Sequence, residues 1–420
     1  MIVLSGASLV LPDRVLSPGT LVIEDGRIAE VRTDTLSAAH AAFAFHGHYI
    51  VPGFIDVHMH GVDGVDTLDV RPDGDAIAAI AARLPRYGVT AFCPTTVACG
   101  PEALRRVLDQ VRRARETPGA RSARVLPAHL ESNFINPEYA GAQPAGCLRS
   151  PRAALAALKG PPHTGVDVRW AAPSGPPSGD VTAAAILAEI ARAAPDVGIV
   201  TLASELDGGL DLVRWLASRG HRVSLGHSGA TYDEALAAIA AGARHATHLF
   251  NRMPPLSHRA PGLVGAVLQT DEVAAELICD GLHVHPALIR TAIAAKRPSR
   301  VFAITDATAA AGLPRGSRAW LGGQPITAGE ATALLPDGTI AGSVLTMDRA
   351  FQTLVGRVGI PLVDAATICA TTPARELSLV GHGVLAPEAV ADLVVLDANF
   401  SVVQTYLAGQ LVYARGQRTE

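Results

Sequence analysis

The sequence predicts an α/β protein in which a (β/α)8 TIM-like barrel carries a small β-sandwich domain built from both termini. Three observations support this prediction. Both ends of the chain alternate short apolar runs with turn residues, eight further apolar runs alternate with helical patterns between them, and 49% of the 420 residues are hydrophobic. Eight alternating strands and helices are what a closed parallel barrel requires. A doubly wound open sheet is the alternative, but no GxGxxG follows an early strand.

The two ends of the chain are expected to form one domain. Near the N-terminus, Gly, Pro and Asp separate four apolar runs, and Asp25-Gly26 is a hairpin signal. The expected strands lie at 2–4, 8–11, 21–23 and 28–31 near the N-terminus and at 391–397, 401–405 and 410–413 near the C-terminus. We therefore expect residues 1–52 and 373–420 to form the sandwich, and residues 53–372 to form the barrel between them.

The middle of the chain supplies the strands and helices of the barrel. The strand candidates are short apolar runs at 54–57, 89–92, 125–128, 198–202, 223–225, 246–249, 275–278 and 301–304. Apolar residues spaced three and four apart predict helices between them, at 102–115, 181–193, 232–240 and 286–296. In such a barrel, functional side chains come from the carboxyl ends of the strands.

The charge balance and the cysteines argue against several classes of protein. A net charge of -4, from 35 basic and 39 acidic residues, lacks the basic excess with which nucleic-acid binders neutralise phosphates. No run of about 18 uncharged apolar residues predicts a membrane span, and the first five residues (MIVLS) lack the basic region of a signal peptide. Five scattered cysteines without a CxxC pair argue against a disulfide framework or a cysteine zinc site. We expect a cytoplasmic protein.

Side chains that bind metals follow the predicted strands. His58 and His60 end the first strand, and in an extended segment they point to the same face. Further groups of this kind end four other strands: His129 with Glu131, His227, His248 and Asp306. Each has an ordinary structural explanation when taken alone, such as a hydrogen-bonded histidine or a helix cap. Seven such groups on five strands together indicate a site for Zn, Fe, Mn or a similar divalent ion.

Longer motifs carry a resemblance to a known family. The matching segments run in order along nearly the whole chain: VPGFIDVHMHG (51–61), GVTAFCPTT (88–96), HLESNFINPEYAGAQP (129–144), SLGHSGATYDEA (224–235), ATHLFNRMPPLSHRAPGLVGAVL (246–268), CDGLHVHP (279–286), ITDATAAAG (304–312) and AGSVLTMDRA (341–350). With these segments the sequence resembles the amidohydrolase superfamily and, within it, the N-acetylglucosamine-6-phosphate deacetylases. The THLFN, GHSxAT and DGLHVHP strings are the most specific part of the resemblance.

The resemblance implies a metal-dependent amide hydrolase. Glu131, His227 and His248 would hold the main ion, and His58 and His60 would join Glu131 at a second one. One or two divalent ions per subunit are therefore expected, with zinc first and iron or manganese as alternatives. Asp306 matches the general base and acid of the family. The implied reaction converts N-acetylglucosamine 6-phosphate into glucosamine 6-phosphate and acetate.

The resemblance also implies substrate contacts and an assembly. Asn251, His283 and the loop of Ile340, Ala341 and Gly342 match segments that contact substrate. In relatives the arginine that corresponds to Arg259 reaches the phosphate of a neighbouring subunit, so a homodimer is expected. His258 beside it is a further candidate for the phosphate, although the segment also has a simple interpretation as a polar loop.

Three departures from the family affect the substrate pocket. Relatives usually have HLEGP where this chain has Ser132 and Asn133 after Glu131. They have a histidine after an alanine where this chain has Ala142-Gln143, and glutamine cannot carry a positive charge. They have THLFNAM where this chain has Arg252, which could contact an anionic group or fill the phosphate pocket. A different N-acyl amino sugar or sugar-derived intermediate is therefore an alternative substrate.

Two other classes of function remain as rivals. A cyclic-amide hydrolase of this barrel commonly bridges two metals with a carboxylated lysine, but the two lysines, Lys159 and Lys296, do not end predicted strands. A deaminase would need a nucleobase pocket, for which the sequence has no pattern. A non-catalytic scaffold would be expected to have lost a ligand or Asp306, and none is lost.

Overall fold

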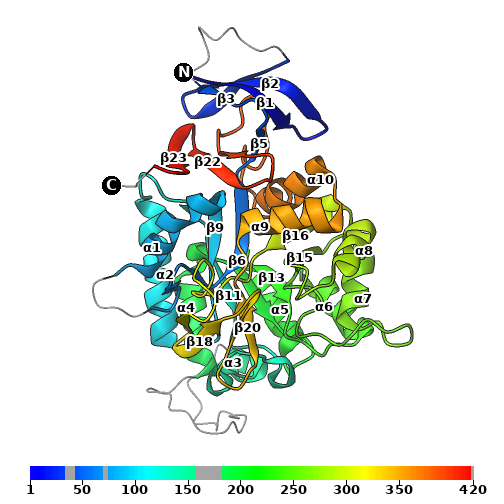
Figure 1. Ribbon diagram of the computed structural model, residues 1–420. Coiled ribbons are helices and arrows are strands. Elements are labelled where there is room, and N and C mark those ends of the chain that lie inside the picture. Colours follow the sequence, from blue (N-terminus) through cyan, green and yellow to red (C-terminus); the bar gives the residue numbers. More distant parts are fainter. Residues whose placement is uncertain (34–42, 70–73, 157–181, 418–420) are drawn as a thin grey trace.

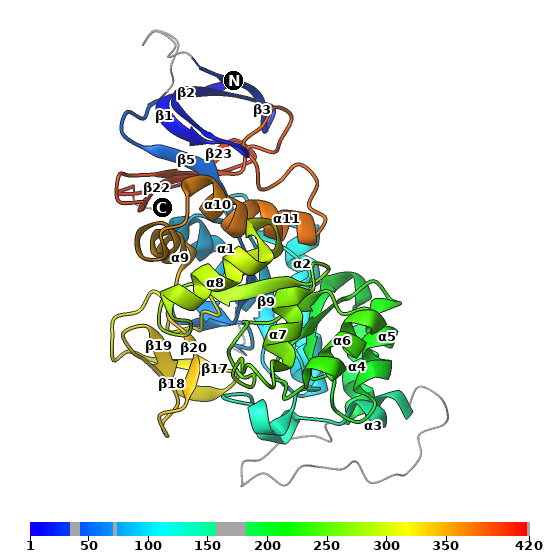
Figure 2. The same ribbon diagram turned by 90° about the vertical axis from the view of Figure 1, so that its right-hand side faces the viewer.

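The computed structural model describes residues 1–33, 43–69, 74–156 and 182–417. A barrel of strands and helices forms its larger part, and a small β-domain made from both termini covers one end of the barrel (Figures 1 and 2). A third, antiparallel sheet lies at the opposite end in both views. The predicted fold class is therefore confirmed.

Eight parallel strands form the barrel. In order around it they are β6 (Phe54–Met59), β9 (Val89–Thr96), β11 (Ala128–Glu131), β12 (Val197–Leu202), β13 (Arg222–Leu225), β14 (His245–Ala246), β15 (Ala274–Ile278) and β16 (Val301–Ile304). The backbone N–H of Asp306 donates to the carbonyl of His58 at 2.9 Å, and Met59 pairs in parallel with Ala307. These contacts join the end of β16 to β6 and close the barrel.

Two of the eight strands differ from the prediction. The run at 125–128 is split at Pro127: β10 (Arg124–Val125) pairs with β9, and the barrel strand β11 begins only after the proline. Proline has no N–H to donate to a strand ladder, which explains the break. The run at 246–249 is a strand only at its start, because the backbone turns to positive φ at His248 (29°) and Phe250 (80°).

The helices around the barrel are amphipathic. In α2, the buried residues Leu104, Val107, Leu108 and Val111 keep the spacing of one helix face. A capping box of Thr231 and Glu234 begins α6. The α-helices are α1 (Ala76–Arg83), α2 (Pro101–Glu116), α3 (Pro151–Ala156), α4 (Ala183–Arg192), α5 (Gly209–Ala217), α6 (Tyr232–Ala241), α7 (Gly262–Gln269), α8 (Pro286–Lys296), α9 (Met347–Gln352), α10 (Leu362–Ala366) and α11 (Thr372–Glu376). The four predicted helices match α2, α4, α6 and α8, although residue 181 lies outside the described residues.

The small β-domain joins strands from both ends of the chain. Its sheet follows the order β23-β22-β21-β5-β1-β2-β3, with β4 beside β1. The predicted hairpin at Asp25-Gly26 is present, with φ of 48° and 77°, whereas the two runs at 2–4 and 8–11 form one bulged strand. The strands are β1 (Ile2–Val10), β2 (Val15–Glu24), β3 (Arg27–Arg32), β4 (Phe43–Ala44), β5 (Tyr49–Pro52), β21 (Leu393–Leu396), β22 (Val402–Leu407) and β23 (Gln410–Ala414).

The sheet at the far end of the barrel was not predicted. Its strands, β17 (Arg318–Leu321), β18 (Gln324–Ala328), β19 (Thr332–Leu334) and β20 (Ile340–Ser343), lie between β16 and α9 in the sequence. The expected loop at residues 340–342 is therefore part of strand β20. A short hairpin of β7 (Gly61–Val62) and β8 (Val65–Asp66) directly follows β6. No helix in the described part of the chain is long and apolar enough to cross a bilayer.

Candidate metal centre and active site

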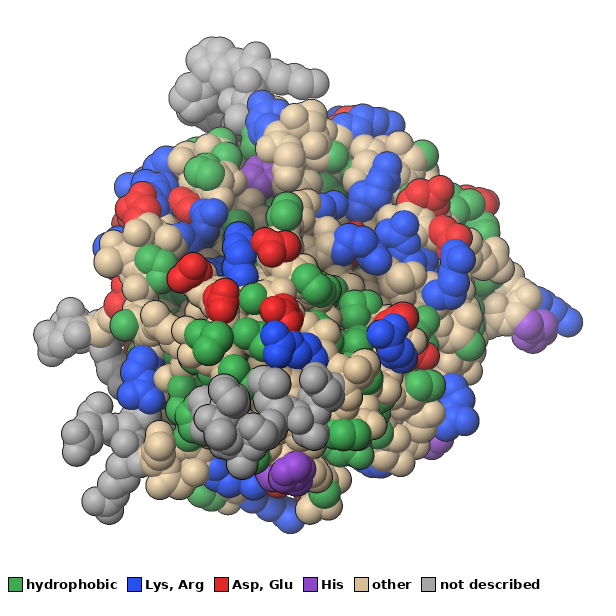
Figure 3. Space-filling model, turned by 90° about the horizontal axis from the view of Figure 1, so that it is seen from above, with side chains coloured by type: hydrophobic (Ala, Val, Ile, Leu, Met, Phe, Trp, Pro, Cys, Tyr) green, Lys and Arg blue, Asp and Glu red, His purple; other side chains and the backbone are tan. Residues whose placement is uncertain are grey.

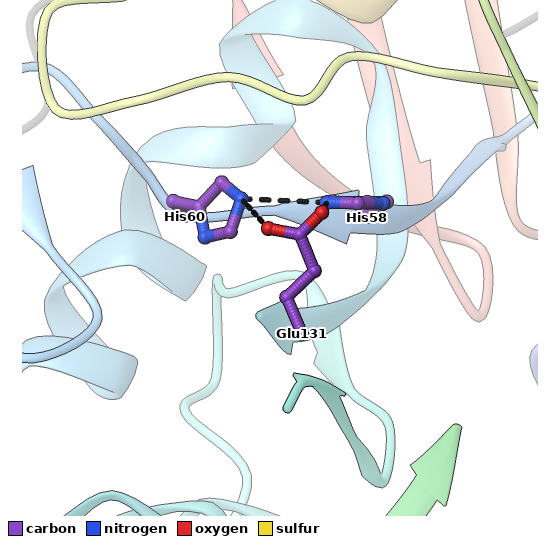
Figure 4. A group of neighbouring side chains, drawn as sticks. All are labelled: His58, His60 and Glu131. Atoms are coloured by element: carbon purple, nitrogen blue, oxygen red, sulfur yellow. Dashed lines mark hydrogen bonds and ion pairs between the residues drawn. The ribbon is translucent and has the colours of Figure 1, made fainter. Parts of the chain in front are cut away.

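The carboxyl ends of the strands bring the predicted metal ligands together. His58 and His60 come from β6 and its end, Glu131 ends β11, and His227, His248 and Asp306 follow β13, β14 and β16. Figure 4 shows that His58 and His60 direct their rings toward the Glu131 carboxylate. All six side chains are buried or nearly so, and Glu131 lies at the centre of the group.

One face of Glu131 meets two histidines. Its Oε1 atom lies 2.7 Å from His227 Nε2 and 2.8 Å from His248 Nε2, and the two Nε2 atoms are 3.1 Å apart. Both histidines have left-handed backbones, with φ of 47° and 29°. Non-glycine residues in this conformation are uncommon and cluster at functional sites. The turn after each strand therefore aims the ring into the barrel mouth.

The other face of Glu131 meets the HxH pair. Its Oε2 atom is 3.5 Å from His60 Nε2, and its Oε1 atom is 3.7 Å from His58 Nε2. The two Nε2 atoms are 3.3 Å apart, so the alternation along β6 does place both rings at one point. Asp306 Oδ1 completes the group at 3.2 Å from His60 and 3.5 Å from His58.

The hydrogen bonds of the outer ring nitrogens show that this donor set fits a divalent metal. His227 Nδ1 lies 2.8 Å from the carbonyl oxygen of Tyr139, and His58 Nδ1 lies 2.9 Å from a Glu276 carboxylate oxygen. A nitrogen that faces such an acceptor carries the hydrogen, so the Nε2 atoms of His227 and His58 turn lone pairs toward Glu131. Lone pairs of imidazole and carboxylate that converge on one point are what a Zn-type ion binds.

The electrostatics of the cluster favour a cation. Burial lowers the pKa of His248, but the Glu131 carboxylate outweighs burial and raises it to about 9. Burial also lowers the pKa of His58, to about 3, so this ring is neutral, as a metal ligand must be. Asp306 is buried as well, yet its hydrogen bond with His60 holds its pKa below the usual range. Asp306 is thus ionised at neutral pH and can accept a proton.

His129 belongs to the same strand as Glu131 but is not turned to the cluster. Its Nδ1 lies 2.9 Å from the carbonyl of Val57, and its Nε2 lies 2.8 Å from the hydroxyl of Thr201. Both nitrogens therefore have partners within the barrel. The sequence pattern counted His129 among the groups at strand ends, and the structure gives it a structural role instead.

A cavity of about 480 Å³ opens above the cluster. His60, Glu131, His227, His248 and Asp306 line its inner end. The predicted substrate residues that also line it are Ala142, Gln143, Asn251, Arg252, His283, Ile340 and Gly342. Ala341 faces the core of the β17–β20 sheet instead, and neither His258 nor Arg259 lines the cavity of the single chain. Both of the latter are exposed.

Gln143 is held in one orientation. Its carbonyl oxygen accepts the backbone N–H of Ala98 at 2.7 Å, which turns its amide nitrogen to Glu131 as a donor. One amide hydrogen is thus used by Glu131, and the second one remains for a molecule in the cavity. The glutamine therefore contacts the metal cluster as well as the cavity.

Other cavity residues were missed by the sequence analysis. Tyr139, Phe250 and Met253 lie within the segments that carry the resemblance, so their motifs could have identified them. Leu321 lies on β17 and had no signal, because that sheet was not predicted. These side chains make part of the wall apolar, a mixture typical of small-molecule sites.

The lysines do not contribute to the site. Lys296 is buried at the end of α8, where its ammonium donates to the carbonyl of Thr270. Lys159 lies outside the described residues. Among the described residues, therefore, Glu131 is the acid between the two histidine pairs, and no lysine takes that place.

Comparison with known proteins agrees with this geometry. The model of the amidohydrolase family matches residues 49–412, which span the barrel and the C-terminal strands of the small domain. The chain belongs to the amidohydrolase family. The human N-acetylglucosamine-6-phosphate deacetylase is 35% identical to this amidohydrolase over an alignment of 430 positions, covering 98% of the chain and 94% of the relative.

Two further relatives bear on the substrate. The N-acetylgalactosamine-6-phosphate deacetylase of Escherichia coli O157:H7 is 32% identical to this amidohydrolase, covering 97% of the chain and 98% of the relative. Among solved structures, a mutant N-acetyl-D-glucosamine-6-phosphate deacetylase from Mycobacterium smegmatis, in complex with N-acetyl-D-glucosamine 6-phosphate, superposes with a TM-score of 0.83 at 30% identity. That comparison covers 98% of this chain and 99% of the other.

Proposed function

We propose that this amidohydrolase removes the acetyl group from N-acetylglucosamine 6-phosphate. Water adds to the amide carbonyl, the C–N bond breaks, and the products are glucosamine 6-phosphate and acetate. The observation that carries the proposal is the cluster of four histidines and Glu131 beside Asp306 at the inner end of the cavity. The named relatives, which act on amino sugar phosphates, support the choice of substrate.

Glu131, His227 and His248 would hold the main ion, and His58, His60 and Glu131 would hold a second. Zinc suits this set of imidazole and carboxylate ligands, with iron and manganese as alternatives. A divalent ion bound here supplies an acidified water and a Lewis acid for the amide oxygen. The protons would be transferred by a side chain of the protein.

Asp306 would carry the proton in both halves of the reaction. Its low pKa leaves it ionised, so it can accept a proton from the attacking water. The same carboxyl, now protonated, can give that proton to the amine nitrogen as the C–N bond breaks. Its place at the cavity wall, 3.2 Å from His60, puts it beside the proposed site of attack.

The phosphate requires a cation, and Arg252 is our candidate. Among the described residues lining the cavity, it is the one arginine or lysine side chain. Its guanidinium packs over Gly141, where an added Cβ would lie 2.5 Å from Nε. Arginine pairs with phosphate through two parallel hydrogen bonds. Asn251 and His283 would bind sugar hydroxyl groups from the same wall.

The other expectations stay predictions. These are the homodimer in which Arg259 and His258 serve a neighbouring subunit, the cytoplasmic location, and the domain boundaries at residues 52/53 and 372/373.

Seen from the small-domain end (Figure 3), basic and acidic side chains are intermixed on the surface.

The epimeric sugar phosphate is a second candidate substrate. The similarity to the N-acetylgalactosamine-6-phosphate deacetylase extends over 97% of the chain, and Gln143 and Arg252 stand where the sequence departs from the usual deacetylase pattern. The test is acetate release from N-acetylglucosamine 6-phosphate, its galactosamine epimer and unphosphorylated N-acetylglucosamine, with protein loaded separately with Zn, Fe(II) and Mn. We expect the first to be the best substrate. If only the galactosamine epimer is deacetylated, that sugar phosphate is the substrate. If metal-loaded protein deacetylates none of the three compounds, the proposed function is wrong.

A further inference from the structure

Glu276 is a buried carboxylate that the proposed reaction does not use. It lies in the middle of β15, between apolar residues, and its side chain has no exposure to solvent. An ionised carboxylate inside a barrel costs several kcal/mol unless its environment compensates. Such a group needs an explanation in terms of what it contacts.

The contacts of Glu276 are with the metal cluster. Its Oε2 atom lies 2.9 Å from His58 Nδ1 and accepts the backbone N–H of His248 at 3.2 Å. One carboxylate oxygen therefore touches a histidine of each half of the cluster. Its Oε1 atom has no hydrogen-bond partner among the described residues, and the nearest histidine nitrogen there is His129 Nδ1 at 3.9 Å.

The contact with His58 fixes both the tautomer and the direction of that ring. Because a carboxylate only accepts hydrogen bonds, the hydrogen of the neutral ring must lie on Nδ1. The Nε2 lone pair is then left facing His60 Nε2 at 3.3 Å, Asp306 Oδ1 at 3.5 Å and Glu131 Oε1 at 3.7 Å. Carboxylate–histidine pairs of this kind orient metal ligands and raise their basicity.

We propose that Glu276 is a positioning residue that makes His58 a ligand and so determines whether this chain binds a second metal ion. The inference rests on the metal site of the proposed function. Glu276 contacts the two histidines differently: its carboxylate hydrogen-bonds the ring of His58 but only the backbone N–H of His248. Its loss should therefore affect the ion at His58, His60 and Glu131 more than the ion at Glu131, His227 and His248.

Two substitutions separate the hydrogen bond from the packing. Glu276→Gln keeps an oxygen that can accept from His58 Nδ1, whereas Glu276→Leu fills similar space without any acceptor. Glu189, which is buried on α4 and paired with Arg105 and Arg192, provides the matched controls Glu189→Gln and Glu189→Leu. The readouts are metal content after dialysis against a graded chelator, the visible spectrum of the Co(II)-loaded protein, and thermal unfolding of the metal-free protein.

The expected result is two ions in the wild-type protein and one in Glu276→Leu, with second-site affinity lowered about 10–100-fold. Glu276→Gln should recover part of that affinity, and both Glu189 variants should bind two ions. In a His58→Asn background, Glu276→Leu should cause no further loss of metal. Metal-free Glu276→Leu should still unfold cooperatively but at a lower temperature than the wild type, because the buried N–H groups of His58 and His248 lose their acceptor.

Two outcomes would overturn the proposal: a wild-type protein that binds one ion, or a Glu276→Leu variant that binds two as tightly as the wild type. None of these readouts uses turnover. If the wild type binds two ions but deacetylates no amino sugar phosphate, the proposed function fails while the role of Glu276 stands.

Discussion

His283 Nδ1 lies 2.6 Å from Asp280 Oδ2, and the side chain of His283 lines the cavity above the metal cluster. The other oxygen of Asp280 accepts the backbone N–H groups of Leu282 and His283, at 2.8 and 2.9 Å. Asp280 is thus fixed by its own loop and in turn fixes the ring of His283. The buried Nε2 atom, which has no partner among the described residues, remains for a ligand.

Replacing Asp280 by asparagine should disturb substrate binding without breaking the loop. The asparagine oxygen is expected to keep the two backbone hydrogen bonds, which turns its NH2 group toward His283 Nδ1. The hydrogen of the ring then moves to Nε2, because Nδ1 must now accept. We expect KM for the amino sugar phosphate to rise by up to about tenfold, with kcat less affected, since a hydrogen bond between neutral groups typically contributes about 0.5–1.5 kcal/mol.

The KM measurement is paired with ¹⁵N NMR of the histidine rings, which reports the tautomer directly. Asp271→Asn, at an exposed ion pair with Arg297, is the matched control and should leave both readouts unchanged. An unaltered KM in a variant whose tautomer has changed would remove His283 from the substrate contacts.

Arg252→Ala should weaken only the binding of the substrate's phosphate group. The variant restores the residue that relatives usually have in the THLFN segment and removes the single arginine from the described cavity wall. We expect kcat/KM for the phosphorylated sugar to fall about 10–100-fold, because charge-assisted hydrogen bonds contribute about 1.5–3 kcal/mol. The rate with unphosphorylated N-acetylglucosamine should stay the same.

Arg259→Ala provides the comparison, because Arg259 is exposed and does not line the cavity of its own chain. A loss in Arg259→Ala with no loss in Arg252→Ala would assign the phosphate to a neighbouring subunit. Sedimentation of both variants shows whether assembly has changed as well.

Stability at acid pH should depend on Glu376, which ends α11. Burial alone would raise its pKa, but contacts with His245 and Arg375 outweigh burial and lower it to about 2. Arg300 approaches the same carboxylate at 3.2 Å. Since the pKa of Glu376 in the folded protein lies below its ordinary value of 4.5, the stabilisation is present above about pH 4.5 and is lost as the pH falls toward 2.

Glu376→Gln should therefore lower the unfolding free energy by up to about 3 kcal/mol near pH 7, and the difference from the wild type should shrink between pH 4.5 and 2. Urea unfolding of metal-free protein at several pH values measures this difference. Glu116→Gln, at an exposed position of α2, is the control. A gap between wild type and Glu376→Gln that stays constant over this pH range would contradict the assignment.

The periodicity of the sequence was sufficient for the barrel, because each strand is a short apolar run between turn residues. The periodicity did not predict the strand ends correctly where the backbone changes direction. Pro127 divides one predicted strand, and the left-handed conformation at His248 ends another after two residues. The β17–β20 sheet was not predicted because its strands mix polar or exposed residues with buried ones, as in RAWL (β17) and QPITA (β18), and so lack a clear apolar run.

The sequence likewise predicted some residues of the site and not others. The ligand-type residues that end strands were predictable, because carboxyl ends of parallel strands meet at one edge. Glu276 was not, since it lies inside the apolar run of β15 and has no strand-end position. His129 has such a position, but the carbonyl of Val57 and the hydroxyl of Thr201 occupy its nitrogens. Only the packed structure distinguishes these two cases.

The most direct test of the account compares wild type and Asp306→Asn in acetate release from N-acetylglucosamine 6-phosphate, at equal metal content. Asparagine keeps the shape of Asp306 but cannot accept the proton of the attacking water. The account predicts rapid turnover by the wild type and a loss of about 10²–10⁴-fold in kcat in the variant, with unchanged metal binding and unfolding temperature. A metal-loaded Asp306→Asn protein that turns over at nearly the wild-type rate would contradict it.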